Sequence, residues 1–135
     1  YNKEVNVDCV DASDVKNAVR NNPTPGFPNP ATTNGTPNNA NPYGGLGFYN
    51  SPVISYASGD GVVVNVTQPG HPLFPGYVVR TTTQTSRGAV VNNYGEGTAA
   101  LQRPGGGAAD YINNVWIQQT RGITKGLKNT CGCSR

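Results

Sequence analysis

The side chains that could transfer protons lie in the middle of the chain. His71 is the only histidine, and its ordinary pKa of about 6.5 suits proton transfer near neutral pH. Glu96 offers a second acid–base group, and Arg80 lies between the two as a cation that could neutralise a phosphate. Thr82 and Tyr94 add hydroxyl donors. A base, an acid and a cation without a metal are what RNA cleavage by attack of its own 2′-hydroxyl requires.

Each of these residues also has an ordinary structural role open to it. His71 lies in a proline-rich stretch, where a loop histidine often bonds only to neighbouring backbone. Glu96 lies between two glycines and could be a turn carboxylate. Arg80 and Thr82 fall on one face of a strand expected over residues 77–85, and that face could simply meet solvent. An arginine in mid-strand is nevertheless unusual for such a face. The pattern suggests acid–base chemistry without specifying it.

The sequence lacks other catalytic signatures. It contains no GxxxxGK[ST] or GxGxxG phosphate loop, no HExxH zinc motif and no GxSxG nucleophile elbow. Four of the seven carboxylates precede residue 15, so a two-metal nuclease site would be difficult to assemble. The chemistry expected is therefore independent of metals and cofactors.

Positive charge is concentrated in the second half of the chain. Residues 1–79 carry three basic and five acidic side chains, a net of −2, whereas residues 80–135 carry seven basic and two acidic, a net of +5. A basic half favours an anionic partner such as nucleic acid, although a solvated surface without a partner gives the same pattern. The residues expected to guide an RNA backbone are Arg87, Arg121, Lys125 and Lys128.

Local patterns predict the elements that must position these residues. A short helix is expected over residues 10–21, where Asp11 and Asp14 resemble a capping box. A long, mostly mobile loop rich in Asn, Pro and Gly is expected from Pro23 to Tyr49. The remaining predictions are strands over residues 52–57, 62–67, 77–85, 89–94 and 98–102, and an amphipathic helix over residues 108–128.

These elements predict an α+β fold. We expect a small antiparallel sheet of four to five strands, with an N-terminal helix and a C-terminal amphipathic helix packed against it. Two parts are expected: residues 1–50, which hold the short helix and an Asn/Pro/Gly-rich entry segment, and residues 51–135, which form the compact catalytic domain.

The cysteines and the start of the chain bear on its environment. Cys9 could pair with Cys131 or Cys133 in an oxidising compartment, and free thiols are equally compatible with the sequence. No apolar window is long enough to span a membrane, and no signal peptide opens the chain. Tyr1 in place of Met suggests a mature or excised piece of a larger protein.

Three segments carry a resemblance to a known group of proteins. The runs GHPLFPGYVVR (residues 70–80) and NNYGEG (residues 92–97), with INNVW (residues 112–116), resemble C-terminal toxin domains of bacterial polymorphic and contact-dependent growth-inhibition toxins. The resemblance covers about half of the chain, residues 69–128. Many such domains are ribonucleases of the barnase–EndoU–colicin–RelE type, in which an antiparallel sheet holds the site and a cognate immunity protein neutralises the activity.

The resemblance implies a toxin that is secreted or displayed as part of a larger protein and that cleaves tRNA or rRNA in the target-cell cytosol. It would be a monomer or a heterodimer with its inhibitor. His71 and Glu96 would transfer protons, Arg80 would bind phosphate, and Thr82 and Tyr94 would assist. The chain departs from the EndoU type, which uses two histidines and a lysine, and from the barnase type in the chain order of its glutamate, arginine and histidine.

Other readings remain open. A weaker likeness, in CVDASDV (residues 9–15), is to secreted fungal guanyl-specific ribonucleases, whose C-terminal histidine has no counterpart here. A toxin acting on a nucleotide such as NAD would place Arg80 on a phosphate and Glu96 on the ribose. A non-enzymatic adhesion or binding module would use a face rich in Tyr, Asn and Thr and would need neither His71 nor Glu96.

Overall fold

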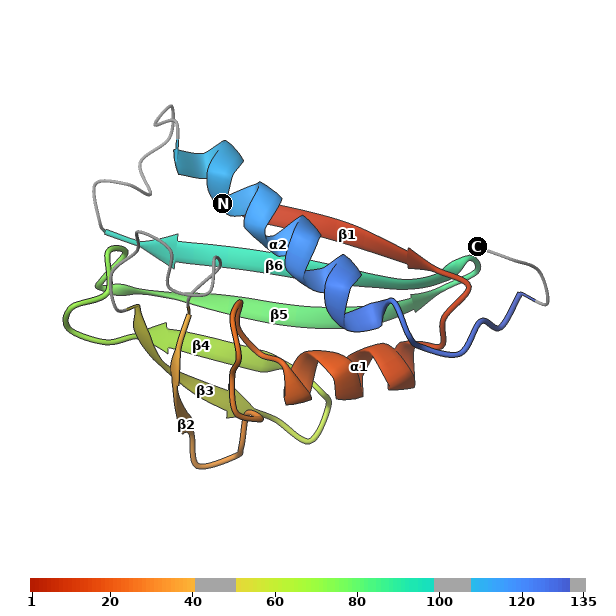
Figure 1. The fold of residues 1–135 in the computed structure, drawn as a ribbon, viewed down its shortest axis with the longest axis horizontal. Coiled ribbons are helices and arrows are strands. Elements are labelled where there is room, and N and C mark those ends of the chain that lie inside the picture. Colours follow the sequence, from red (N-terminus) through yellow and green to blue (C-terminus); the bar gives the residue numbers. More distant parts are fainter. Residues whose placement is uncertain (41–50, 99–107, 132–135) are drawn as a thin grey trace.

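The structure is a computed structural model that describes residues 1–40, 51–98 and 108–131, and it contains one antiparallel sheet with two helices on the same face (Figure 1). The helices are α1 (Ala12–Asn21) and α2 (Ala108–Thr124). The strands are β1 (Asn2–Asp8), β2 (Thr36–Asn39), β3 (Pro52–Ala57), β4 (Val63–Thr67), β5 (Gly76–Thr85) and β6 (Gly88–Gly97). They lie in the order β1-β6-β5-β4-β3-β2. The α+β class is confirmed, and the sheet has six strands instead of four to five.

The first strand, β1, forms one edge of the sheet. β1 pairs with β6 over its whole length, from Asn2 opposite Tyr94 to Asp8 opposite Gly88. Its sequence has only two apolar residues, which is too weak an alternation to stand out. β1 and α1 share the sheet and the core with the later strands.

The segment expected to be a long loop contributes the edge strand β2. Its four residues, TPNN, carry no strand pattern, and their pairing with β3 is a product of tertiary packing. Pro23 and Thr24 are buried, whereas the side chain of Phe27 is 97% exposed to solvent. The expected strand over residues 98–102 begins at Thr98, which is not in a strand, and the rest of it lies outside the described residues.

The hairpin of β5 and β6 is the longest paired element. Ten residues of each strand are in register, from Gly76 opposite Gly97 to Thr85 opposite Gly88. Gly88 has a φ of +145°, and a Cβ there would lie 2.5 Å from the carbonyl oxygen of Val7. A glycine is therefore needed where the end of β1 passes the turn.

The core lies between the helices and one face of the sheet. α1 buries Val15 and Val19, and these valines pack with Val63 and Val91 of the strands. A second cluster joins Val78 to residues of α2, chiefly Trp116. Valine and alanine dominate the first cluster, which matches the low apolar content of the chain.

The helix α1 begins at Ala12, two residues after the predicted start at residue 10, and its capping differs from the predicted capping box. Asp11 is the N-cap residue, yet its carboxylate makes no bond to the backbone of the first turn and accepts instead from the Ser13 hydroxyl. The Ala12 N–H donates to the side-chain oxygen of Gln84 on β5, at 3.0 Å. A tertiary contact thus satisfies the first N–H of the helix, whereas a capping box would have bonded the N–H groups of Asp14 and Asp11.

One disulfide links the two ends of the fold. Cys9 pairs with Cys131, which decides among the alternatives that the sequence left open, while Cys133 lies outside the described residues. Beside the disulfide, the Thr130 N–H donates to the Cys9 carbonyl at 2.7 Å. The bridge fastens the chain after α2 to the end of β1.

Candidate functional site

Alternation along β5 and β6 separates the predicted catalytic residues. Tyr77 lies opposite Glu96 in the register, and Arg80 lies opposite Asn93. Because successive side chains point to opposite faces, Arg80 and Thr82 belong to the face that the helices cover, whereas Tyr94 and Glu96 belong to the other. The structure therefore does not bring Arg80 together with Glu96.

Arg80 is fully buried between the sheet and α2. Its Nε donates to the side-chain oxygen of Asn93 at 2.7 Å, and its guanidinium carbon lies 4.5 Å from the ring centroid of Trp116. Burial lowers its pKa to about 9, so the side chain stays cationic at neutral pH. With 0% exposure, the guanidinium cannot reach the phosphate of a substrate in this conformation.

The rest of the guanidinium fastens the helices to the sheet. Its terminal nitrogens donate to the carbonyl of Pro23 at 3.2 Å and to the hydroxyl of Thr120 on α2 at 3.0 Å. Thr82, two residues further along β5, has a buried hydroxyl oxygen without a hydrogen-bond partner. The Arg80 guanidinium and the Thr82 hydroxyl are thus buried on the face that the helices cover, and neither lies beside Glu96.

His71 lies in the loop between β4 and β5 and is bonded within that loop. Its Nδ1 accepts the Leu73 N–H at 2.9 Å, which places the proton of the neutral imidazole on Nε2. Burial lowers the pKa of His71 to about 4. At neutral pH the imidazole is therefore an uncharged donor, and it is a weak base for the role predicted from the sequence.

Glu96 lies in the open with two tyrosine hydroxyls. Tyr77 donates to its carboxylate at 2.5 Å and Tyr94 at 3.3 Å. The hydrogen bond and charge of Glu96 raise the pKa of Tyr77, and chiefly the charge of Glu96 raises that of Tyr94. Both phenols therefore remain protonated donors at neutral pH. No role was predicted for Tyr77 from the sequence. The alternation of side chains along β5 could have placed it on the same face as Glu96.

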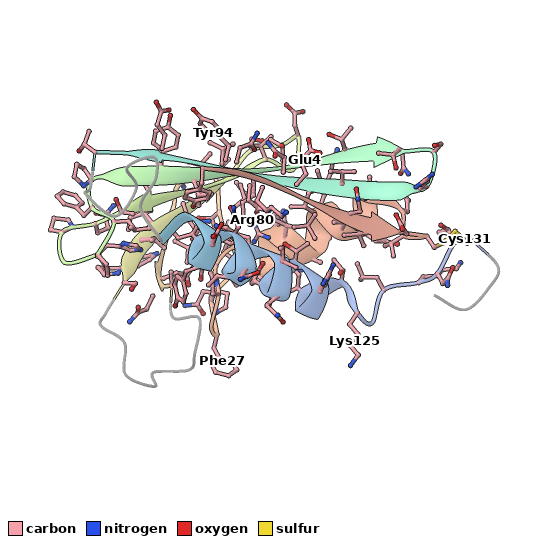
Figure 2. All side chains as sticks on the ribbon, turned by 90° about the horizontal axis from the view of Figure 1, so that it is seen from above. Glu4, Phe27, Arg80, Tyr94, Lys125 and Cys131 are labelled. Atoms are coloured by element: carbon pink, nitrogen blue, oxygen red, sulfur yellow. A yellow bond between two sulfur atoms is a disulfide. The ribbon has the colours of Figure 1, made fainter. Side chains whose placement is uncertain are left out.

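We use the term uncovered face for the strand side chains that point away from α1 and α2. In Figure 2, Tyr94 and Glu4 lie on this side of the sheet, and Lys125 and Phe27 lie on the side of α2. Cross-strand registers join Tyr56, Val64, Val79, Tyr94 and Asn2 in one row and Pro37, Ile54, Val66, Tyr77 and Glu96 in the next. Aromatic and aliphatic side chains therefore adjoin one another across five strands.

The charges on the two sides of the molecule differ in sign. The strand residues of the uncovered face include Glu4 and Glu96 and, within the described strands, no lysine or arginine. The basic residues predicted to guide RNA lie elsewhere: Arg87 is in the turn after β5, and Arg121, Lys125 and Lys128 are exposed on or just after α2. The structure thus separates the predicted RNA-guiding residues from Glu96 and Tyr94.

Two absences concern the described part of the chain. Within residues 1–40, 51–98 and 108–131, no three His, Cys, Asp or Glu side chains are grouped closely enough to hold a metal ion. In the same ranges, no helix has the length and apolar character that crossing a membrane requires.

The chain was also compared with known proteins. No protein-family model, no curated protein and no solved structure matches it at a significant level.

Proposed function

We propose that this chain is a recognition domain that binds a partner protein through the uncovered face of its sheet. The observation that carries the proposal is a set of three tyrosines on adjoining rows of that face, Tyr56, Tyr77 and Tyr94, which are 38–41% exposed. Tyrosine supplies a large contact area at low cost in side-chain entropy, and it is enriched among residues that dominate binding energy.

The surroundings of the tyrosines support this use. Val64, Val66 and Val79 are partly exposed between them, so the rows form a continuous semi-apolar surface instead of isolated rings. A contact surface of this kind has an apolar centre with a polar rim. Asn2 and Glu96 end the two rows and supply polar groups at that rim.

The charge of the face selects among partners. Glu4 lies on β1, and Glu96 lies on β6, the strand that also carries Tyr94; among the described strands the face has no cation to offset them. Complementary charge steers association and disfavours partners of the same sign. The partner is therefore a protein with lysine or arginine opposite β1 and β6, and a polyanion such as RNA is disfavoured on this face.

RNA cleavage remains a second candidate with one supporting observation. The Glu96 carboxylate and the hydroxyls of Tyr77 and Tyr94 form an exposed group that could exchange protons with a substrate. In this alternative, a protein that covers the face would act as the immunity protein. The cation near the reacting phosphate would have to come from a residue other than Arg80.

The two candidates are separated by expression in the bacterial cytosol followed by analysis of total RNA. Growth arrest with discrete RNA fragments that disappear in Glu96→Gln would favour the ribonuclease. Intact RNA and normal growth would favour the recognition domain.

Recognition itself is tested with a photo-crosslinking amino acid placed at Tyr94, and at Tyr111 as the matched control. Tyr111 is equally exposed, at 40%, but belongs to α2 on the other side of the sheet. A protein captured only from position 94 would then be purified and its affinity measured. We expect Tyr94→Ala to weaken binding about 10- to 30-fold and Tyr111→Ala to change it less than about twofold. Equal effects at the two positions would reject the uncovered face.

A further inference from the structure

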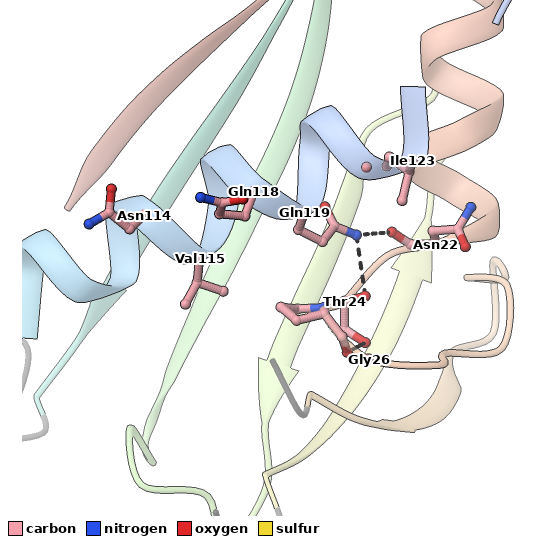
Figure 3. A pocket seen from close by; sticks show the side chains of 10 residues that line it. Asn22, Thr24, Gly26, Asn114, Val115, Gln118, Gln119 and Ile123 are labelled. Carbon is pink, nitrogen blue, oxygen red and sulfur yellow. Dashed lines mark hydrogen bonds between the residues drawn. The ribbon is translucent and has the colours of Figure 1, made fainter. Parts of the chain in front are cut away.

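A groove lies on the other side of the molecule, between α2 and the chain that follows α1 (Figure 3). Its volume is about 700 Å³, within the range of small-molecule sites. The residues that line it are Asn22, Thr24, Pro25, Gly26, Asn114, Val115, Gln118, Gln119, Gly122 and Ile123. Because the whole sheet separates it from the uncovered face, the groove is independent of the function proposed above.

Among the described residues, the lining contains no charged side chain and four carboxamides, those of Asn22, Asn114, Gln118 and Gln119. A carboxamide has two N–H donors and one oxygen acceptor. The amide nitrogens of Asn22 and Gln119 already donate to backbone carbonyls, so Asn114 and Gln118 are the ones that can supply donors to a ligand. Asn114 and Gln118 are exposed to solvent. An anionic or cationic ligand would find no opposite charge here, whereas a neutral ligand whose groups both donate and accept would find partners of both kinds.

Gln119 is held in place at the centre of the groove. Its Nε2 donates to the carbonyls of Asn22 at 2.8 Å and Thr24 at 3.3 Å, which fixes the orientation of the amide (Figure 3). Its Oε1 is buried and has no hydrogen-bond partner. A buried acceptor without a partner costs free energy, and a small shift that let a ligand hydroxyl reach it would recover that cost.

Apolar surface accompanies the amides. Val115 and Ile123 are partly exposed along the groove, and between them Gly122 leaves the helix surface open: a Cβ built there has no atom within 4 Å. These two aliphatic side chains give the groove an apolar wall beside its amides.

From this lining we propose that the groove binds a short, neutral oligosaccharide. Sugar hydroxyls both donate and accept, as carboxamides do, and the C–H faces of a pyranose suit Val115 and Ile123. The open helix surface at Gly122 lets the ligand approach the backbone of α2. A phosphorylated or carboxylated sugar is disfavoured because the described residues of the lining include no cation to hold it.

The test is a titration of ¹⁵N-labelled protein followed by NMR of the side-chain amides. The probes are maltotriose, cellotriose and chitotriose, which cover α-linked, β-linked and N-acetylated sugars, with a blocked, uncharged alanine tetrapeptide for comparison. We expect at least one trisaccharide to shift the amide signals of Asn114, Gln118 and Gln119 in a saturable way.

Two glycines give a matched pair of variants. Gly122 lines the groove and Gly126 does not, and a Cβ at either has open space around it. Gly122→Leu should therefore fold, since leucine favours a helix more than glycine does, and its side chain should fill the groove and weaken binding at least tenfold. Gly126→Leu should change the affinity less than twofold.

Three results would overturn the proposal. No saturable shift with any trisaccharide would show that the groove does not take neutral sugars. Shifts with the peptide alone would make it a peptide site. Equal loss of affinity in the two leucine variants would place sugar binding outside the groove.

Discussion

The guanidinium of Arg80 stacks on the indole of Trp116, with 4.5 Å between the guanidinium carbon and the ring centroid, and this contact joins the central strand β5 to α2. Trp116 also donates from its indole nitrogen to the hydroxyl of Tyr1 at 3.2 Å, and desolvation by burial raises the pKa of Tyr1 to about 12. A cation, an aromatic ring and a neutral phenol thus form one buried group under the sheet. Their role in the structure is to connect the helix, the central strand and the N-terminus.

The first prediction follows from the burial of Arg80. Arg80→Ala should lower the free energy of unfolding by about 3–5 kcal/mol, because it leaves a cavity and strips partners from Asn93 and Thr120. The change in the free energy of unfolding is measured by urea denaturation, with tryptophan fluorescence as the signal. Thr83→Ala, on the exposed face of the same strand, is the control and should lie within about 0.5 kcal/mol of the wild type. Unchanged stability in Arg80→Ala would contradict a structural role.

The second prediction concerns pH. The pKa of His71 is about 4 in the folded protein, below its ordinary value of 6.5, so below pH 6.5 the unfolded chain binds a proton that the folded chain does not. Stability should therefore fall as the pH drops from 6.5 towards 4. The expected loss from this group between pH 7 and 5 is about 1 kcal/mol after allowance for solvent screening.

The matched variant for this measurement is His71→Asn. Its side-chain oxygen can accept the Leu73 N–H as Nδ1 does, but it does not titrate. Denaturation midpoints measured from pH 7 to pH 4 should show a shallower pH dependence in the variant. Parallel curves for the two proteins would show that His71 is not the titrating group.

The third prediction concerns the tyrosines beside Glu96. Glu96→Gln removes the charge that contributes to the raised pKa of Tyr77 and Tyr94, so both values should fall towards 10. Ultraviolet titration of phenolate formation, or NMR of labelled tyrosine, measures the change. Glu4→Gln removes a charge from the same face on β1 and serves as the control. Equal shifts of the tyrosine pKa values in the two variants would indicate that the overall negative charge of the face raises them, and not the local contact with Glu96.

The fourth prediction concerns the Cys9–Cys131 disulfide. Cys9→Ser should lower the free energy of unfolding by about 2–4 kcal/mol, since the bridge closes a loop that spans nearly the whole chain. Reducing agent should destabilise the wild type by a similar amount and leave the Cys9→Ser variant unchanged. A variant that loses further stability on reduction would reveal a second bridge.

Much of the fold was predictable because its signals are local. The alternation along β5 and β6, the turn at Ser86-Arg87 and the apolar stripe of α2 all depend on residues a few positions apart. β1 and β2 were not predictable in this way. Val5 and Val7 alone do not mark a strand, and TPNN has no strand pattern; both strands exist because a neighbouring strand offers its backbone.

The sequence by itself determined which side chains share a face, since a strand alternates with a period of two. It placed Arg80 and Thr82 on one side of β5 and Tyr77 on the other. Only the tertiary structure decided which side the helices cover. Arg80 is buried because Trp116 and Thr120, far along the chain, supply a ring and a hydroxyl that satisfy it. That choice left the tyrosines exposed, because both described helices pack on the opposite face of the sheet.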